Sequence, residues 1–448
     1  MKKQNILLLI VTVVLFLSVC CILLFSPDDS ADTLSGTIEE PAQKMELIMW
    51  AEQDGLDTFE QNCVDKYNQT STTARIRVVS RPREVDTDTI ASLMSGTAPD
   101  ILILSDNEVI TYANMGLLRP MDSYLSSWKE LDGMNMEILN RYKIRGGYYG
   151  LPCGEYAMGL LYNRKLFKES GITPPKSWTW DEFLETAVRL TNAEKEQYGF
   201  ALNWRQWGAW TFQMFAWAGG DDLSQIESNE KLDTTFTAPG VIKAAAFYRS
   251  LKQNKCIQPD STKKLDTLKQ DFAQGKAAMI YVGLDDLESF TSRGMALSNI
   301  GFLPLPVGPS GTNQTQLGGS CYVMTIGVEE QKRQAVFDYY SLLCSRKIIE
   351  DKEEYYLSEN AAYMGGEIRT DVSYTYPGEL NGSMLNTIKS YQDNGRYSFY
   401  GYSVLTPFVE KAIEKIMTDE TVDLEETFSY YEDEANRQAV KLYNNSIS

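Results

Sequence analysis

The sequence contains no histidine among its 448 residues. Histidine is the side chain that most often acts as a general base near neutral pH, and it is also a frequent zinc ligand. Its absence excludes catalytic triads that depend on histidine and zinc sites built on paired histidines. Enzymes that work with two carboxylates are not excluded, because that chemistry needs only Asp or Glu side chains.

Cysteine is scarce, and the seven cysteines show no regular spacing. An odd number of scattered cysteines without a Cys-x-x-Cys pair is typical of small buried apolar side chains rather than of a disulfide framework or a metal site. Two cysteines lie near the N-terminus, and the other five are Cys63, Cys153, Cys256, Cys321 and Cys344. We therefore predict neither a metal site nor a cofactor.

The glycine-rich loop that binds ATP phosphates is also missing. Gly275-Lys276 is followed by alanine where that motif has Ser or Thr, and the upstream glycine is absent. The chain is therefore not predicted to hydrolyse ATP by this route.

Basic residues are outnumbered, with 42 Lys and Arg against 61 Asp and Glu and a net charge of −19. Such a surface repels nucleic acid and anionic lipid head groups. The hydrophobic fraction of 43% and the charged fraction of 23% are those of an ordinary globular protein. We predict a folded protein that does not bind nucleic acid.

The N-terminal segment is apolar enough to meet a membrane. Lys2 and Lys3 precede residues 6–25, which carry no charge and as a helix would span roughly 30 Å, about one hydrocarbon core. The positive-inside rule places the lysines in the cytoplasm and the following chain outside. We interpret residues 1–26 as a signal peptide or membrane anchor, and residues 27–43, which are polar and aperiodic, as a flexible tether.

Three outcomes stay open for this segment: a lipoprotein signal, an uncleaved anchor and a cleaved secretory signal. Leu17-Ser18-Val19-Cys20 resembles a bacterial lipobox, which makes Cys20 a lipidation candidate. Val19 stands where that motif has Gly or Ala, and the apolar run continues past the cysteine. All three outcomes place the folded part outside the cytoplasm.

The first folded part alternates between strands and helices. Residues 45–50, 76–79 and 101–104 have strand patterns, the last one apolar enough to be buried on both faces. Helices are predicted between them, the first capped by Asp57. This order predicts a parallel sheet, and ligands bind outside the carboxyl ends of such strands. The polar and aromatic side chains at those ends are Trp50, Glu52, Ser105, Asp106 and Asn107.

In residues 148–184, turn-forming residues separate the predicted elements clearly. The order is a Gly-Leu-Pro loop, an apolar strand, a short helix and a Pro-Pro turn. Gly171 ends the short helix, and the next helix opens with a capping box formed by Thr179 and Glu182. A second α/β part is therefore predicted after residue 155.

An aromatic cluster follows in this second part. Trp210, Met214 and Trp217 keep helical spacing and are predicted to face the core. Trp204 and Trp207 precede that helix in a polar loop, where an aromatic face could stack on a sugar ring. We therefore take both as candidates for lining a binding cleft.

The order of these motifs resembles a known family, the extracellular solute-binding proteins of sugar-type ABC importers, which are similar to maltose-binding protein. The resemblance rests on residues 148–152, on the Pro-Pro and tryptophan run after them, on residues 272–279 and on Gly318-Gly319-Ser320. It implies an α/β fold of type II, with two lobes, each a mainly parallel sheet flanked by helices, and a ligand cleft between them. The expected lobes are 44–154 plus 284–345, and 155–283 plus 346–448.

The resemblance and the sequence pattern together give the remaining ligand-binding candidates. Gly283 can let the backbone approach a ligand, with Asp285 beside it, and Tyr397 precedes the helix that begins near Pro407. The further candidates are Glu155, Gly319 and Ser320. No catalytic residue and no metal ligand is predicted.

Three functions compete at this stage. The first is a monomeric binding protein that closes on a sugar or oligosaccharide and delivers it to an ABC permease, without chemistry on the ligand. The second is an extracellular carbohydrate-active enzyme that uses paired carboxylates. Among 61 acidic residues, neighbours such as Asp285-Asp286 or Glu329-Glu330 occur without catalytic meaning, so they do not identify such a pair. The third is an ectodomain that senses a ligand without transporting it.

Overall fold

The computed structural model describes residues 44–52, 56–81, 86–205, 207–228, 231–358, 367–374, 380 and 382–446. The predicted signal or anchor, the tether and Cys20 lie outside these residues. Lys44–Ser448 form one compact unit. Within the described ranges, no helix is both long and apolar enough to span a bilayer.

The first five elements alternate between strand and helix, as the sequence predicts. They are β1 (Met45–Glu52), α2 (Thr58–Thr70), β2 (Ala74–Arg81), α3 (Asp86–Ser95) and β3 (Leu102–Ser105). β1 and β2 pair in parallel, and Met49 bridges to Ile101 in the same sense. A capping box between Asp57 and Glu60 starts α2, which confirms the predicted cap.

The expectation that the strand over 101–104 is buried on both faces is wrong. Leu102 and Leu104 are buried, but Ile103 between them is 39% exposed. Ile103 lies at the edge of a small, mainly apolar cavity of about 50 Å³ that Phe59 and Cys153 also line. This open space beside the sheet leaves one face of β3 partly uncovered.

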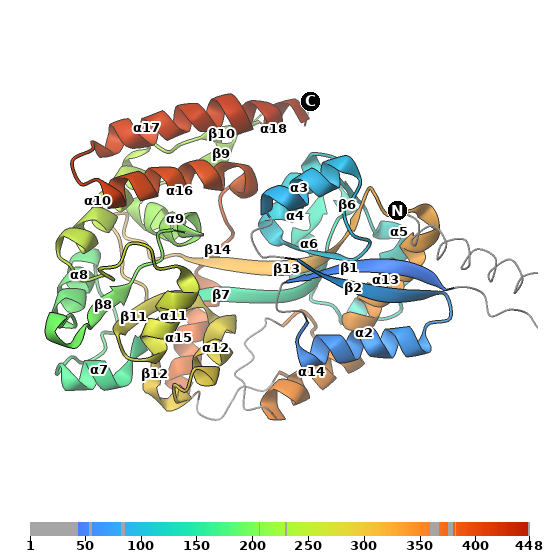
Figure 1. Cartoon of the computed structure of the whole chain (residues 1–448), viewed down its shortest axis with the longest axis horizontal. Coiled ribbons are helices and arrows are strands. Elements are labelled where there is room, and N and C mark those ends of the chain that lie inside the picture. The colour runs from blue at the N-terminus through green and yellow to red at the C-terminus, as the bar shows by residue number, and fades with distance from the viewer. Residues whose placement is uncertain are drawn as a thin grey trace, which may run out of the picture. The chain divides into compact units, whose positions relative to one another are not determined.

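Two long antiparallel strands form the centre of the fold (Figure 1). These are β7 (Leu151–Asn163) and β13 (Thr315–Thr325). The first half of β7 pairs with β13, and its second half pairs with β11 (Ala277–Gly283) and β12 (Ile300–Leu303). β13 pairs in turn with β3, β4 (Leu118–Arg119) and β14 (Gly395–Arg396), and β11 pairs with β8 (Tyr198–Ala201), which completes an eight-stranded sheet.

The prediction of mainly parallel sheets therefore needs a correction. β1–β2, β11–β8 and β13–β14 are parallel pairs, whereas β7 and β13 pair antiparallel with each other and with β3, β4, β11 and β12. β7 runs out along this sheet and β13 returns along it, so neighbours in the centre run in opposite directions. Two small antiparallel ribbons lie apart from it, β5 (Lys143–Ile144) with β6 (Gly147–Tyr148) and β9 (Ser224–Ile226) with β10 (Leu232–Thr234).

Helices cover the sheets on both halves of the molecule (Figure 1). In the first half they are α2 and α3, together with α4 (Asp106–Asn114), α5 (Asp122–Leu125), α6 (Met136–Arg141), α13 (Glu330–Leu343) and α14 (Arg346–Ser358). Around the second they are α7 (Arg164–Glu169), α8 (Trp180–Arg189), α9 (Gly208–Gly219), α10 (Pro239–Gln253), α11 (Leu265–Ala273), α12 (Leu287–Ser292), α15 (Gly382–Asp393), α16 (Tyr402–Thr418), α17 (Leu424–Ala435) and α18 (Lys441–Ser446). α8 opens with the predicted capping box of Thr179 and Glu182, and Gly171 takes the left-handed conformation with φ +64°.

Buried side chains form one large hydrophobic cluster and smaller ones. The large cluster joins β7, β8 and β11 to α9, α10 and α16, and it also takes in side chains between Leu284 and Leu305. Smaller clusters join β1, β2 and β3 to α4 and α13. The predicted lobe boundaries stay a prediction, but the segment 284–305 shares its core with the elements after β7.

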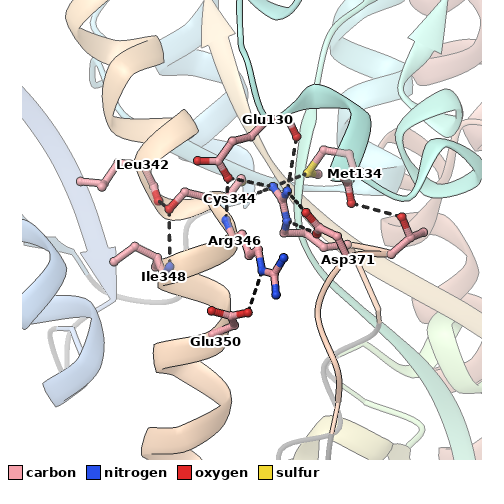
Figure 2. Close-up of polar contacts among 12 residues, drawn as sticks. Glu130, Met134, Leu342, Cys344, Arg346, Ile348, Glu350 and Asp371 are labelled. Atoms are coloured by element: carbon pink, nitrogen blue, oxygen red, sulfur yellow. Dashed lines mark hydrogen bonds and ion pairs between the residues drawn. The ribbon is translucent and has the colours of Figure 1, made fainter.

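A buried arginine ties three segments together. Arg369 is 1% exposed, and its Nε and Nη2 each donate to Asp371 at 2.8 Å, while Nη1 donates to the carbonyl oxygen of Cys344 at 2.8 Å. Glu130 lies 3.5 Å from Nη1. Glu130, Cys344 and Asp371 thus converge on one guanidinium (Figure 2), an arrangement that we name the Arg369 clasp. Because a buried cation is costly without such partners, the clasp holds the three segments in place.

Gly133 lies close to the side chains of Arg369 and Asp371, and only a residue without a Cβ atom fits there unless these side chains move. A Cβ atom at this position would lie 2.0 Å from Nη2 of Arg369 and 2.4 Å from Oδ2 of Asp371. We therefore predict that Gly133→Ala lowers the free energy of unfolding by about 1–3 kcal/mol, because the added methyl group displaces the buried guanidinium of Arg369 from its partners. Thermal unfolding measured by circular dichroism checks this.

Gly382→Ala is the matched control for this prediction. Gly382 is exposed at the start of α15, and an added Cβ there meets nothing within 4 Å. Its substitution is expected to leave stability unchanged or slightly raised. Equal melting temperatures for the two variants would contradict the role given to Gly133.

Candidate functional site

A polar cluster lies where β7, α6, the start of α4 and the segment before α16 meet. It consists of Asp106, Arg141, Glu155 and Tyr397, and we call it the Glu155 cluster. Glu155 lies on β7, Arg141 is the last residue of α6, Asp106 is the first residue of α4, and Tyr397 follows β14. Four segments that are far apart in the sequence therefore contribute one side chain each.

Three of these side chains bind one another. Arg141 Nη1 and the Tyr397 hydroxyl both donate to Oε1 of Glu155, the tyrosine at 3.1 Å. The guanidinium of Arg141 also lies over the Tyr397 ring, 4.5 Å from its centroid. The side chains of Arg141 and Glu155 keep 24% and 15% of their surface exposed, so both are partly open to solvent. Burial and the negative charge of Glu155 raise the pKa of Tyr397, so its hydroxyl stays protonated as a donor.

Asp106 is the most buried member of the cluster, with 7% of its surface exposed. Its Oδ1 accepts the backbone N–H of Asn107 at 2.9 Å. Among the described residues, no donor reaches its Oδ2. Desolvation raises the pKa of Asp106 to about 7, although the Asn107 N–H and the charge of Arg141 act in the opposite direction.

The two residues before Arg369 hold the start of α6, the helix that ends in Arg141. Asn135 caps the start of α6, and its backbone N–H donates to the carbonyl of Ile368 at 2.8 Å, while its side-chain amide donates to the carbonyl of Glu367 at 3.1 Å. These contacts fix the first turn of a helix whose last residue is Arg141. The segment that carries Arg369 is therefore linked to the Glu155 cluster through α6.

A buried amide network holds the segment of Tyr397. Gln213 on α9 and Gln316 on β13 are both fully buried. Gln213 Nε2 donates to Oε1 of Gln316 at 2.6 Å, and Nε2 of Gln316 donates to the hydroxyl of Ser398 at 2.7 Å. The backbone N–H of Phe399 donates to Oε1 of Gln213 at 3.2 Å. The residues directly after Tyr397 are therefore attached to both α9 and β13.

The structure brings together most of the predicted site residues. Ser320 on β13 pairs with Ser105 on β3, and Gly319 pairs with Glu155 on β7. Asp106 and Asn107 follow Ser105 directly at the start of α4. The hydroxyls of Ser105 and Ser320 already bind within the protein, to Glu108 at 2.8 Å and to the Cys153 sulfur at 3.3 Å.

The prediction that Trp204 lines the cleft is not supported, since its side chain is 3% exposed within the large hydrophobic cluster. Gly283 is buried at the end of β11 with φ −61°, and its close approach to a ligand stays a prediction. Trp50 and Trp207 are half-buried at the edges of hydrophobic clusters. The side chains of Glu52 and Asp285 lie outside the described part of the structure.

The sequence did not indicate Arg141 as a site residue, and it predicted that Trp210 is buried more fully than the structure shows. Trp210 is half-buried and meets the ring of Tyr156 edge-on, with 5.7 Å between centroids. Tyr156 follows Glu155 on β7, so its side chain leaves the opposite face of the strand. Nothing in the residues around Arg141 marks it, because its partners Glu155 and Tyr397 are distant in sequence.

The predicted state of the cysteines is confirmed for the described part of the chain. All five cysteines there are free, and four are buried. Desolvation raises the pKa of the thiols of Cys63 and Cys153 to about 11 and that of Cys256 to about 12, which disfavours the reactive thiolate. In the same residues, no group of three Cys, Asp or Glu side chains is arranged to hold a metal ion.

Comparison with known proteins identifies the family. Residues 62–353 match the model of the bacterial extracellular solute-binding proteins. The chain belongs to this family. Solved structures of similar fold include an ABC transporter solute-binding protein of Thermotoga lettingae bound to α-D-tagatose. Its TM-score is 0.73 at 17% identity, over 88% of this chain and 99% of that one.

A second structure is the GacH receptor of Streptomyces glaucescens, solved unliganded and with acarbose. Its TM-score is 0.72 at 18% identity, over 89% of this chain and 99% of that one. These likenesses confirm the predicted two-lobed type II α/β fold.

The relatives that match by sequence cover a smaller share of the chain than the solved structures do. A binding protein of Brucella abortus is 27% identical over 226 residues, which are 50% of this chain and 53% of the relative. The galactooligosaccharide-binding protein of Bacillus subtilis is 22% identical over 71% of each chain. The maltotriose-binding protein of Pyrococcus abyssi is 24% identical over 48% of this chain and 43% of its own. The match thus spans about half the length of the first of these relatives.

The amide network makes a prediction for this solute-binding protein. Gln213→Leu leaves the Oε1 of Gln316 and the N–H of Phe399 without this partner in a buried place. We expect the free energy of unfolding to fall by about 1–3 kcal/mol. Differential scanning calorimetry measures the loss, with Gln334→Leu on the exposed face of α13 as the control. Wild-type stability in Gln213→Leu would contradict the role of the network.

Proposed function

We propose that this protein is the extracytoplasmic solute-binding component of an ABC importer and that its solute is a sugar or an oligosaccharide. The observation that carries the proposal is the Glu155 cluster, in which a guanidinium, two carboxyls and a phenol lie together, with Asp106 buried and the other three partly exposed. Family membership supports the binding role. Two of the relatives are named for binding galactooligosaccharide and maltotriose, and the two solved neighbours hold α-D-tagatose and acarbose, which supports a saccharide as the solute.

The chemistry of the cluster suits a molecule rich in hydroxyl groups. Each sugar hydroxyl donates one hydrogen bond and accepts others, so it needs fixed acceptors beside fixed donors. Glu155 and Asp106 supply carboxyl oxygens, and Arg141 supplies N–H donors in a planar fork. Since these groups already hold one another, little side-chain entropy remains to be lost when a solute binds.

Transport requires two further parts, which we also propose. Two lobes close on the solute by bending at the long strands β7 and β13, and the closed form is recognised by membrane permease subunits. We propose that the lobes follow the hydrophobic clusters, so that the segment 284–305 moves with the elements after β7. We propose a monomer that an N-terminal anchor or a lipid on Cys20 keeps at the outer face of the cell membrane.

No observation in the described residues favours an enzyme. Of the carboxyl pairs that the sequence offered, Asp286 is bound to Lys269, and Glu330 is exposed at the start of α13. Glu155 is engaged by both Arg141 and Tyr397. This arrangement is more simply explained by a protein that binds its solute and leaves it chemically unchanged.

A panel of saccharides tests the proposal. Monosaccharides, oligosaccharides and sugar alcohols, with peptides and polyamines as controls, are screened by melting temperature and by tryptophan fluorescence. A ligand that binds the native state alone raises the melting temperature. We expect at least one saccharide to do so. A shift with peptides or amines and none with any saccharide would contradict the proposed solute.

Variants then locate the site. Tyr397→Ala and Glu155→Ala are expected to weaken saccharide binding at least about tenfold, which corresponds to ~1.4 kcal/mol. Tyr400→Ala is the matched control, because Tyr400 lies in the same segment but is 53% exposed. Titration calorimetry measures all three. Equal affinity in the Tyr397 and Tyr400 variants would place the solute elsewhere.

A further inference from the structure

The C-terminal helix α18 reaches from the second half of the molecule to the first. Nδ2 of Asn114, the last residue of α4, donates to the hydroxyl of Tyr443 on α18 at 3.1 Å. In Figure 1, α18 lies at the end of the C-terminal helices that is nearer the first half. Tyr443 is 4% exposed, and Asn114 is half-buried. This hydrogen bond links the two halves outside the long strands β7 and β13.

Polar contacts hold α18 on the second half. Oδ1 of Asn444 accepts the backbone N–H of Leu232 at 2.8 Å, and Nδ2 of Asn444 donates to the carbonyl of the same residue at 3.0 Å. Thr234, on the same strand β10, donates to the side chain of Asn436 at 3.0 Å. The ring of Tyr443 packs in the large hydrophobic cluster. We therefore expect α18 to move together with the second half.

The helix α4 and its neighbours belong to the first half. Val109 and Tyr112 of α4 are buried in a smaller cluster that also contains side chains of β3. Burial raises the pKa of Tyr443, and the hydrogen bond from Asn114 and the charge of Arg145 oppose this rise. Arg145, in the turn between β5 and β6, is thus a second group of the first half that faces the Tyr443 hydroxyl. Because the contact is polar and each helix is packed in its own cluster, the two helices can separate without breaking either core.

This contact lies apart from the Glu155 cluster. Asp106 is the first residue of α4 and Asn114 is the last, so at 1.5 Å per residue the two are roughly 12 Å apart along the helix. A single sugar ring is shorter than this separation. An effect of Tyr443 on a small solute held at the cluster must therefore act through the position of the two halves.

We propose that the hydrogen bond between Asn114 and Tyr443 is a latch, which forms when the two halves close on a solute and slows its release. The inference rests on the proposed function, and it assigns Tyr443 to the control of closure rather than to contact with the solute. A bond that exists only in the closed form shifts the equilibrium toward that form by its own free energy. The solute enters the open form, in which the latch is not made, so its association rate does not depend on the latch.

Stopped-flow tryptophan fluorescence tests the latch, with the shortest saccharide that raises the melting temperature in the panel. Tyr443→Phe removes only the hydroxyl and keeps the buried ring. We expect release to become about two- to tenfold faster, the effect of one neutral hydrogen bond, with an unchanged association rate constant. Tyr430→Phe is the matched control, because Tyr430 lies on α17 and is 59% exposed. Its rate constants should equal those of the wild type.

A second variant and a measurement without solute separate a latch from a contact that only stabilises the fold. Asn114→Ala should also speed release, but it should add nothing to Tyr443→Phe, because the bond is already lost. The melting temperature of the solute-free protein should be equal in the wild type and in Tyr443→Phe, since the open form lacks the bond. A lower solute-free melting temperature together with wild-type release would overturn the proposal.

The remaining outcomes distinguish the latch from the proposed function. Wild-type release in Tyr443→Phe overturns the latch and leaves the proposed function standing. A defect that grows with the length of the saccharide also overturns the latch, because Tyr443 would then contact the solute. Failure of every saccharide to bind overturns the proposed function and the latch with it.

Discussion

Backbone pairing between β7 and β13 fixes the register on which the candidate site depends. The pairing brings Gly319 opposite Glu155, and the same stretch of β13 brings Ser320 opposite Ser105 at the end of β3. β13 also pairs with β14, which leads directly to Tyr397. A slip of one residue would turn Glu155 to the other face of the sheet and separate it from Arg141 and Tyr397.

Two supports outside this ladder complete the cluster. The backbone of Glu367 and Ile368, next to Arg369, holds the start of α6, the helix of Arg141. The buried amides of Gln213 and Gln316 hold the residues after Tyr397. Both supports are polar groups in surroundings of low dielectric, where hydrogen bonds are stronger and a missing partner costs more. Rigid polar packing around a partly exposed cluster is what a site for a hydroxyl-rich solute requires.

The parts of the structure that sequence could predict are those with short-range causes. The capping boxes at Asp57 and Thr179 depend on residues three positions apart, so the starts of α2 and α8 were correct. The alternation of apolar runs predicted the first strands and helices. Because ligands bind outside the carboxyl ends of parallel strands, this prediction also indicated Ser105 and Asp106. Gly319 and Ser320 came from the family resemblance, because a glycine-rich turn alone has many meanings.

What sequence alone determined here is therefore local geometry, fold family and the polar strand ends, since each follows from neighbouring residues or a recognisable order of motifs. Tertiary structure decided the rest. The antiparallel course of β7 and β13, the burial of Trp204, and the meeting of Arg141 with Glu155 and Tyr397 depend on pairings between segments that are distant in the chain. Such contacts are set by packing of the whole fold, and no spacing within one segment encodes them.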